Sequence, residues 1–284
     1  MMQGPDIGEV VLHHTADAWT IDLYPLGEIH LPRWEPVHIG SFSVNLSPTK
    51  HVVFMILAAA LVFLTMWLAG RSLERQRAHQ KAPKGFAAMI EAMVLFVRND
   101  IVIANIGHGG EKFAPYIMTL FFFILYSNLL GMLPWGASPT GNLAVTAALA
   151  LTAFLTIEIT GMVTLGPKGY LHTIFMNVPG MSGAGALAIS VAMAPIEILG
   201  KFVKPFALAV RLFGNMVAGH FVILSLFGII FLFGQLAIWN WAIGITTAAL
   251  VLGIMLLELF VAFLQAYVFA LLTSVFIGLM RHEH

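Results

Sequence analysis

Long stretches of this sequence contain no Asp, Glu, Lys or Arg, among them residues 51–70, 113–157 and 212–257. An α-helix needs about 20 predominantly apolar residues to cross the hydrocarbon core of a bilayer, and each stretch reaches or exceeds that length. The chain is therefore predicted to be an integral membrane protein of the all-α, polytopic class.

The composition supports this prediction and excludes several functions. The 284 residues are 59% hydrophobic and 10% charged, with a mean hydropathy of +0.90, which is more apolar surface than a soluble domain of this length can bury. The formal net charge is zero, which argues against a nucleic-acid partner. The absence of cysteine excludes disulfides and thiolate metal sites. No signal peptide is expected, because the first Lys or Arg is Arg33 and the first apolar run begins near Val52.

Basic loops orient the predicted spans. Residues 1–50 carry more acidic than basic side chains, and GSFSVNLSPT within them alternates loosely, so a short strand or hairpin is expected there. The span at 51–70 is followed by RSLERQRAHQKAPKG, whose basic side chains are typical of a cytoplasmic loop. Residues 1–50 are therefore expected to be an extracytoplasmic segment, and residues 51–284 the membrane domain.

The middle of the chain predicts a surface helix and two further spans. At about 85–106, charged residues interrupt an apolar helical pattern, which is typical of an amphipathic helix at the cytoplasmic surface. Spans are expected at about 114–133 and 141–165, because LPWGASPTGN between them is a strong turn signal. The stretch GPKGYLH is then expected to be a loop that returns the chain to the cytoplasm.

The last two spans, about 185–233 and 242–280, are longer than a perpendicular crossing requires, so they should be tilted or kinked. Pro195 and Pro205 give the first of them a physical reason to bend. With Arg281 inside, the prediction is five spans plus a surface helix, with the N-terminus outside and the C-terminus in the cytoplasm.

A stripe of polar side chains follows the fourth span and falls within an arc of about 80° on a helical wheel. Its members are Glu197, Lys201, Lys204, Arg211 and Asn215. One interpretation is that both lysines extend to the cytoplasmic headgroups and pair with Glu197. Arg211 lies about 10 Å further along the helix than Lys204, where a charge costs roughly 2.5–3.5 kcal/mol. Its counter-charge is expected on another chain.

The last span and His220 point to proton exchange. Glu258 and Gln265 are seven residues apart and therefore share one face of a helix. Apolar surroundings disfavour a charged carboxylate, and histidine exchanges protons near neutral pH, so a His220–Glu258 relay is one interpretation. The other is a buried ion pair that only fixes helix packing. The weaker candidates are Glu158, which is expected to be solvated near a helix end, Asn128 and Asn142.

No zinc, haem or phosphate motif and no nucleophile with its base occurs in the sequence, so no metal, cofactor or catalytic bond-making is expected. A secondary transporter is one alternative and would use Arg211 and Glu258 for its substrate, although the usual paired repeats are not visible. A structural subunit of a respiratory complex is another alternative, although such a subunit needs no polar stripe.

Two stretches, PFALAVRLFGNMVAGH and ELFVAFLQAYVFALLTSVFIG, closely resemble subunit a of the proton-translocating F-type ATP synthases. TGNLAVTAALAL and PIEILGKFVKP fit the same family, and the resemblance covers roughly residues 85–280. It implies a multi-pass, non-catalytic protein of the bacterial inner membrane, surrounded by membrane lipid. The partners it implies are a ring of small proteolipid rotor subunits (subunit c), the peripheral-stalk subunit b and, indirectly, the soluble catalytic sector.

The resemblance also implies residue roles. Arg211 matches the arginine that faces the rotor ring, whose subunits each bear one membrane-buried carboxylate. Two aqueous half-channels end near this arginine, so that protons enter from outside, ride the ring and leave to the cytoplasm. His220 and Glu258 match a pair in the outer half-channel, in the exchanged order relative to some members. The other matches are Asn215 and Gln265 near the arginine, Glu197 and Lys204 in the inner half-channel, and Asn142 where some members have an acid.

Overall fold

The computed structural model describes residues 17–22, 27–39, 42–45, 47–78, 84–133, 136–175, 184–233 and 240–282. Segments that are far apart in the sequence form two compact units. The first unit comprises Met1–Leu64, Phe123–Asn142 and Leu212–Gln265, and the second comprises Thr65–Phe122, Leu143–Arg211 and Ala266–His284. Each polar cluster described below lies within one of these units.

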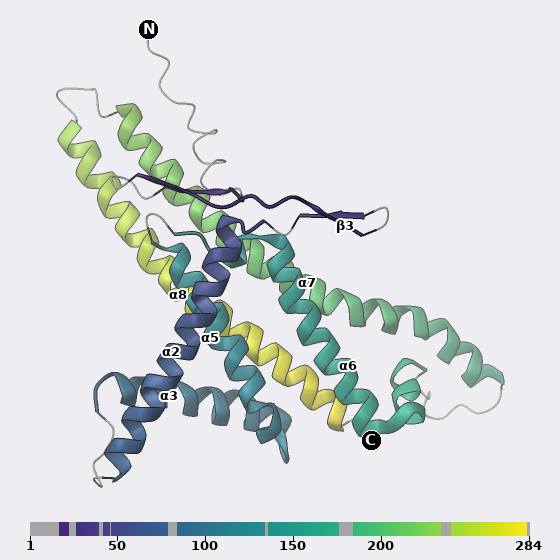
Figure 1. The fold of residues 1–284 in the computed structure, drawn as a ribbon. Helices are drawn as coiled ribbons and strands as arrows, with labels where there is room; N and C mark the ends of the chain where they lie inside the picture. Colours follow the sequence, from purple (N-terminus) through teal and green to yellow (C-terminus); the bar gives the residue numbers. More distant parts are fainter. Residues whose placement is uncertain are drawn as a thin grey trace. The chain divides into compact units, whose positions relative to one another are not determined.

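Long helices make up most of the described chain (Figure 1). The principal ones are α2 (Lys50–Ala78), α3 (Phe86–Phe96), α5 (Ala114–Gly131), α6 (Leu143–Ile174), α7 (Ala184–Phe233) and α8 (Asn240–His282). Within the described residues, five helical stretches are long and apolar enough to cross a membrane. The predicted class, a polytopic helical membrane protein with five spans, is therefore confirmed. The last two helices are the longest, with 50 and 43 residues, and α7 contains Pro195 and Pro205.

The predicted surface helix is helical but not uniformly α. After α3 the chain winds more widely through the π-helix η1 (Val97–Ile103), and then forms α4 (Ala104–Ile106). The buried side chains recur on one face, as expected of an amphipathic helix, and they are Ala87, Ile90, Val97, Ile101, Val102 and Ile106. A short 3₁₀ helix, η2 (Gly110–Phe113), leads into α5.

A kink in α6 brings part of the chain back against the helix. Gly166 has φ 71°, a left-handed conformation that glycine adopts without steric cost, and Pro167 begins the next helical piece, where its missing N–H is tolerated. The chain then remains helical to Ile174. The expectation of a loop over GPKGYLH was therefore wrong, because a single glycine makes the reversal and the residues after it resume helical bonding.

The N-terminal segment forms two small antiparallel hairpins. Strand β1 (Thr20–Asp22) pairs with β2 (Glu28–His30), and β3 (Val37–Ile39) pairs with β4 (Phe42–Val44). The second hairpin includes part of the predicted GSFSVNLSPT strand, whereas the first was not predicted. Another short 3₁₀ helix, η3 (Pro139–Gly141), precedes α6.

The first unit places this N-terminal segment on α2. Ile21 is buried in a cluster with Phe54 and Ala58 of α2, and Leu130 and Ala137 belong to the same cluster. At the start of α2, the backbone N–H of Lys50 donates to the carbonyl of Ala18 over 2.8 Å. The segment is therefore fixed at the first turn of α2 by both apolar and backbone contacts.

Close helix packing in the second unit depends on a glycine in α8. A Cβ atom at Gly278 would lie 2.1 Å from the backbone oxygen of Asn105. That oxygen belongs to the backbone of α4 and cannot rotate away, so only glycine permits this approach. By contrast, a Cβ at Gly253 of the same helix would meet no atom within 4 Å.

Gly278→Ala should lower the thermal unfolding midpoint of the purified, detergent-solubilised chain. Overpacking of a close contact typically costs about 1–3 kcal/mol, which corresponds to a shift of several degrees. Gly253→Ala is the matched control and should leave the midpoint unchanged or raise it, since alanine favours the helix. Equal midpoints for the two variants would show that the contact at Gly278 does not limit packing.

Candidate functional site

Histidine and glutamate face each other in the first unit. His220 of α7 and Glu258 of α8 lie with Nδ1 and Oε1 3.9 Å apart, and their side chains are 24% and 6% exposed. Among the described residues, no hydrogen-bond donor reaches either carboxyl oxygen of Glu258. The two groups are near enough for an ion pair but too distant for a direct hydrogen bond, a spacing that water commonly bridges. This geometry suits a pair that exchanges protons through water.

Two glycines make room for this pair. A Cβ at Gly219 would lie 2.7 Å from Oε1 of Glu258, closer than real Cβ contacts. At the end of α5, a Cβ at Gly131 would lie 2.5 Å from Cβ of Ser138 and 3.1 Å from Nε2 of His220. The carboxyl and the imidazole therefore occupy space that any larger residue at these two positions would take.

A buried amide network lies beside the pair in the same unit. Gln265 of α8 donates from Nε2 to the carbonyl of Leu212 over 2.7 Å. Asn128 of α5 donates to Gln265 Oε1 over 3.4 Å and to the Ala262 carbonyl over 3.3 Å, and it accepts from the Thr140 hydroxyl over 2.6 Å. Asn128 and Gln265 are 0% and 4% exposed. Asn128, a weak candidate in the sequence, is thus the residue that orients Gln265.

Arg211 directly precedes Leu212 in α7 and is exposed, as is Asn215 one turn later. Leu212 itself is buried at 1% exposure, so neighbouring positions of the helix differ sharply in their surroundings. Phe206 and Val210, on the approach to Arg211, are 69% and 41% exposed. Arg211 is therefore an exposed cation of α7, with exposed polar side chains at Lys204 and Asn215 and exposed apolar ones at Phe206 and Val210.

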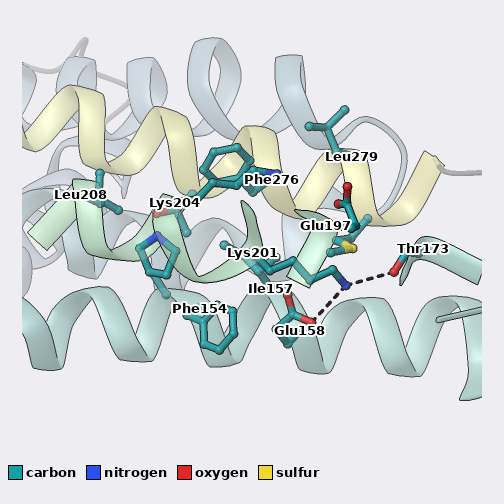
Figure 2. A pocket seen from close by; sticks show the side chains of 14 residues that line it. Phe154, Ile157, Glu158, Thr173, Glu197, Lys201, Lys204, Leu208, Phe276 and Leu279 are labelled. Atoms are coloured by element: carbon teal, nitrogen blue, oxygen red, sulfur yellow. Dashed lines mark hydrogen bonds and ion pairs between the residues drawn. The ribbon is translucent and has the colours of Figure 1, made fainter. Parts of the chain in front are cut away.

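The second unit contains a buried lysine between the two pieces of α6 (Figure 2). Lys201 of α7 is 7% exposed, and its Nζ lies 3.6 Å from Oε2 of Glu158 and donates to the Thr173 hydroxyl over 3.0 Å. The same Nζ lies 4.3 Å from the ring centroid of Tyr170, whose hydroxyl donates to Glu158 Oε2. Each charge in this cluster is paired and hydrogen-bonded, as burial requires.

This cluster corrects two expectations. Glu158 was expected to be solvated but is 8% exposed and paired with Lys201. Lys201 was expected to extend to headgroups and pair with Glu197, yet in the part of the chain that the structure describes no ion pair joins Glu197 to Lys201 or Lys204. The helical wheel placed these residues on one face, but the partner of Lys201 comes from a helix about forty positions earlier in the sequence.

A cavity of about 70 Å³ lies between α6, α7 and α8 in the second unit, and polar side chains line part of its mostly apolar wall. Since one water needs at least about 10–15 Å³, there is room for several. Figure 2 shows the polar side chains in its lining, which include Glu158, Thr173, Glu197, Lys201 and Lys204. Lys204 is exposed and has its Nζ 5.0 Å from the Phe276 ring centroid. Glu197 and Lys204, which the resemblance places together, thus line one cavity that can hold several waters.

Several functional candidates could not be identified from the sequence. Tyr170 lies in the stretch that was expected to be a loop, Thr173 directly follows that stretch, and Thr140 lies in the predicted turn. Asn142 donates from Nδ2 to Oδ2 of Asp17 over 3.4 Å. No role for Asp17 was predicted from the sequence. The available signal was weak in each case, namely a polar residue next to a span.

The family model and the similar proteins that match this chain all name the same ATP synthase subunit. The family model described as ATP synthase A chain matches residues 52–278. ATP synthase subunit a 2 of Chlorobaculum tepidum is 45% identical over 96% of this chain and 72% of its own length. ATP synthase subunit a of Chloroherpeton thalassium is 42% identical over 96% of this chain and 77% of its own length. The subunit a of Anaeromyxobacter dehalogenans is 41% identical over 96% of this chain and 70% of its own length. The similarity thus extends over nearly the whole chain.

The amide network predicts a coupled loss of stability. Asn128→Leu should destabilise the purified chain by about 1–3 kcal/mol, because it leaves buried partners unsatisfied, and Thr140→Val should cost less. The double variant should lose less than the sum, because the two residues share one hydrogen bond. Thermal unfolding in detergent measures all three. Thr152→Val on the exposed side of α6 is the control and should be nearly neutral, and strict additivity would contradict a shared network.

Proposed function

Because the chain belongs to the ATP synthase A chain family, we propose that it is the stator subunit that couples transmembrane proton flow to rotation of a ring of carboxylate-bearing subunits. Members of this family are proton-translocating subunits of the membrane sector. The five candidate spans and the bacterial relatives indicate an integral protein of the bacterial inner membrane. Bond-making in ATP synthesis is then the task of the soluble catalytic sector.

The observation that carries the proposal is the exposure of Arg211 on α7, in a helix long and apolar enough to span a membrane. A rotor carboxylate that passes this surface is attracted to the guanidinium in its deprotonated form and released when it is protonated. The permanent positive charge also repels protons, so that it blocks a direct leak between two aqueous paths. Gln265, held by Asn128 and bonded to the carbonyl of Leu212, steadies the backbone next to the arginine.

We assign the outer half-channel to His220 and Glu258, with Asn215 between them and the rotor surface. Support comes from the spacing of 3.9 Å and from the two glycines that keep this space open. A proton from outside passes between the imidazole and the carboxyl and then to a rotor carboxylate. In this assignment the N-terminus is outside and the C-terminus is in the cytoplasm, as the basic loops predict.

We assign the inner half-channel to the cavity that Glu197 and Lys204 line. Its volume of about 70 Å³ admits water. Glu158 and Lys201 form a neutral pair in its wall, so the proton-accepting carboxylate in this cavity is Glu197 rather than Glu158. The peripheral-stalk subunit b is expected to hold this chain against the turning ring.

The arrangement also makes energetic sense. One elementary charge that crosses 100 mV yields about 2.3 kcal/mol, so several protons have to be gathered for each ATP. A rotor adds these small steps together, and a leak past Arg211 would lose them. Family membership also disfavours the two alternatives, a secondary transporter and a structural subunit of a respiratory complex.

Arg211→Ala should abolish proton-driven ATP synthesis in inverted membrane vesicles while the complex still assembles, because no cation then attracts the rotor carboxylate. Assembly is checked by co-purification of the soluble catalytic subunits. Arg98→Ala is the control, since Arg98 forms a surface ion pair with Glu111 and such pairs contribute little. Normal synthesis by the Arg211→Ala variant would refute the proposed function.

The His220–Glu258 pair predicts a rescue by exchange. His220→Ala and Glu258→Ala should each slow proton flux through the membrane sector, measured with a pH-sensitive dye, by about a hundredfold or more. The double variant His220→Glu with Glu258→His should recover part of that loss, because it keeps one imidazole and one carboxyl at the same distance. His108→Ala on the exposed turn before η2 is the control. Unchanged flux in His220→Ala would reduce this residue to a packing role.

A further inference from the structure

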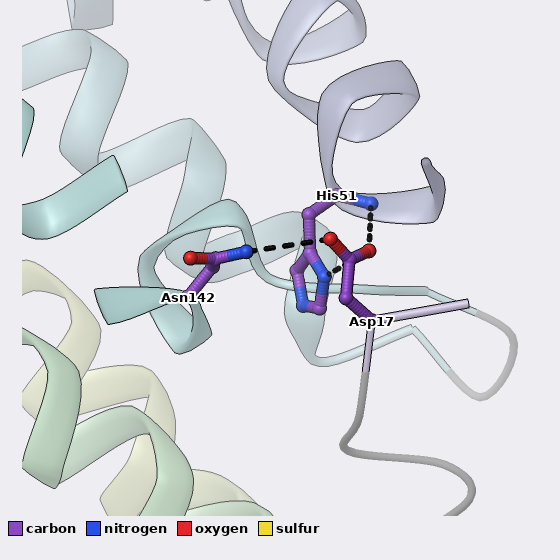
Figure 3. Close-up of polar contacts among 3 residues, drawn as sticks. All are labelled: Asp17, His51 and Asn142. Carbon is purple, nitrogen blue, oxygen red and sulfur yellow. Dashed lines mark hydrogen bonds and ion pairs between the residues drawn. The ribbon is translucent and has the colours of Figure 1, made fainter. Parts of the chain in front are cut away.

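A second carboxylate–imidazole pair lies at the first turn of α2, in the first unit (Figure 3). Asp17 Oδ1 lies 2.8 Å from Nδ1 of His51 and 3.4 Å from its backbone nitrogen. The other carboxyl oxygen of Asp17 accepts from Asn142 over 3.4 Å. The His51 side chain is 6% exposed and that of Asp17 33%. The carboxylate therefore reaches the surface, whereas the imidazole lies inside.

This geometry is held in place from two sides. The Lys50 N–H bond to Ala18 and the burial of Ile21 against α2 fix the chain directly after Asp17, and the two Asp17 oxygens are held by His51 and Asn142. A carboxylate also caps a helix N-terminus favourably, and a cap alone is the simplest role for Asp17. A cap, however, requires neither a buried imidazole on the same oxygen nor an amide donor on the other.

The pair lies close to the His220–Glu258 pair. His51 and the buried Lys50 begin α2, which belongs to the same unit as His220 and Glu258. Phe54, one turn after His51, packs in the same cluster as Leu130, and the adjacent Gly131 borders His220 Nε2. The end of α5 therefore borders His220 directly and reaches His51 through Phe54, within one unit.

We propose that Asp17 and His51 form the outer mouth of the proton path and deliver protons to His220 and Glu258. This inference rests on the proposed function and extends it to the N-terminal segment. The partly exposed Asp17 carboxylate takes a proton from water and passes it to Nδ1 of His51. The imidazole then gives up a proton from Nε2 to water that leads to His220, so that one proton enters and one leaves. Asn142 holds the carboxylate in place and takes no proton itself.

The test uses the whole complex in sealed vesicles, with proton flux through the membrane sector followed by a pH-sensitive dye. Asp17→Asn and His51→Gln should each lower the flux by about tenfold, less than the usual 10²–10⁴ for an acid–base group, because water bypasses part of the route. The double variant should be no slower than either single variant, because the two residues act in series. Glu28→Gln, an exposed acid of β2 in the same segment, should match the wild type.

A second measurement separates proton delivery from a structural cap. The impermeant sulfonate buffer MES, raised in concentration on the outer side, should restore flux in Asp17→Asn and His51→Gln, because a mobile buffer replaces the lost proton collector. A defect that MES does not relieve, or flux within about twofold of the wild type in either variant, overturns this inference. If those variants behave as the wild type while Arg211→Ala remains inactive, only the inference fails, and the proposed function stands.

Discussion

The cost of placing charge in apolar surroundings is the constraint on which the rest of this structure depends. Buried polar side chains of α7 and α8 meet this constraint through hydrogen bonds and an ion pair. Lys201 is neutralised by Glu158 and bonded to Thr173, and Gln265 is bonded to the Asn128 side chain and a backbone carbonyl. These contacts fix the side chains in place, and such rigidity suits the proposed role of the chain as the stationary subunit beside a rotating ring.

The remaining polar groups have surroundings that leave them able to act. Glu258 accepts no hydrogen bond from the described part of the chain and has only His220 at ion-pair distance. Arg211 is exposed on α7, and Glu197 lines a cavity with room for several waters. In the proposed function, the fully bonded groups Lys201 and Gln265 position their neighbours, whereas Glu258 and Glu197 exchange protons.

Much of the fold and part of the site follow from local patterns. The charge-free runs predicted the five spans, and the polar spacing along α7 singled out Glu197, Lys204 and Arg211. The partner of Lys201 was predicted wrongly, because a helical wheel orders residues around one helix and carries no information about a second one. The helical piece after Gly166 was missed for a related reason, since Gly-Pro is equally typical of a loop and of a kink between helices.

The sequence alone determined the class of the protein, the number of its spans and the polar positions that cost free energy in a bilayer, because hydrophobic length and charge are properties of short stretches. Only the tertiary structure decided which polar groups meet. Asp17 contacts His51 and Asn142, and Asn128 contacts Gln265. The contacts to Asn142 and to Gln265 each join residues more than a hundred positions apart in the sequence. Such pairings depend on how helices pack, and packing is set by the whole chain rather than by any one segment.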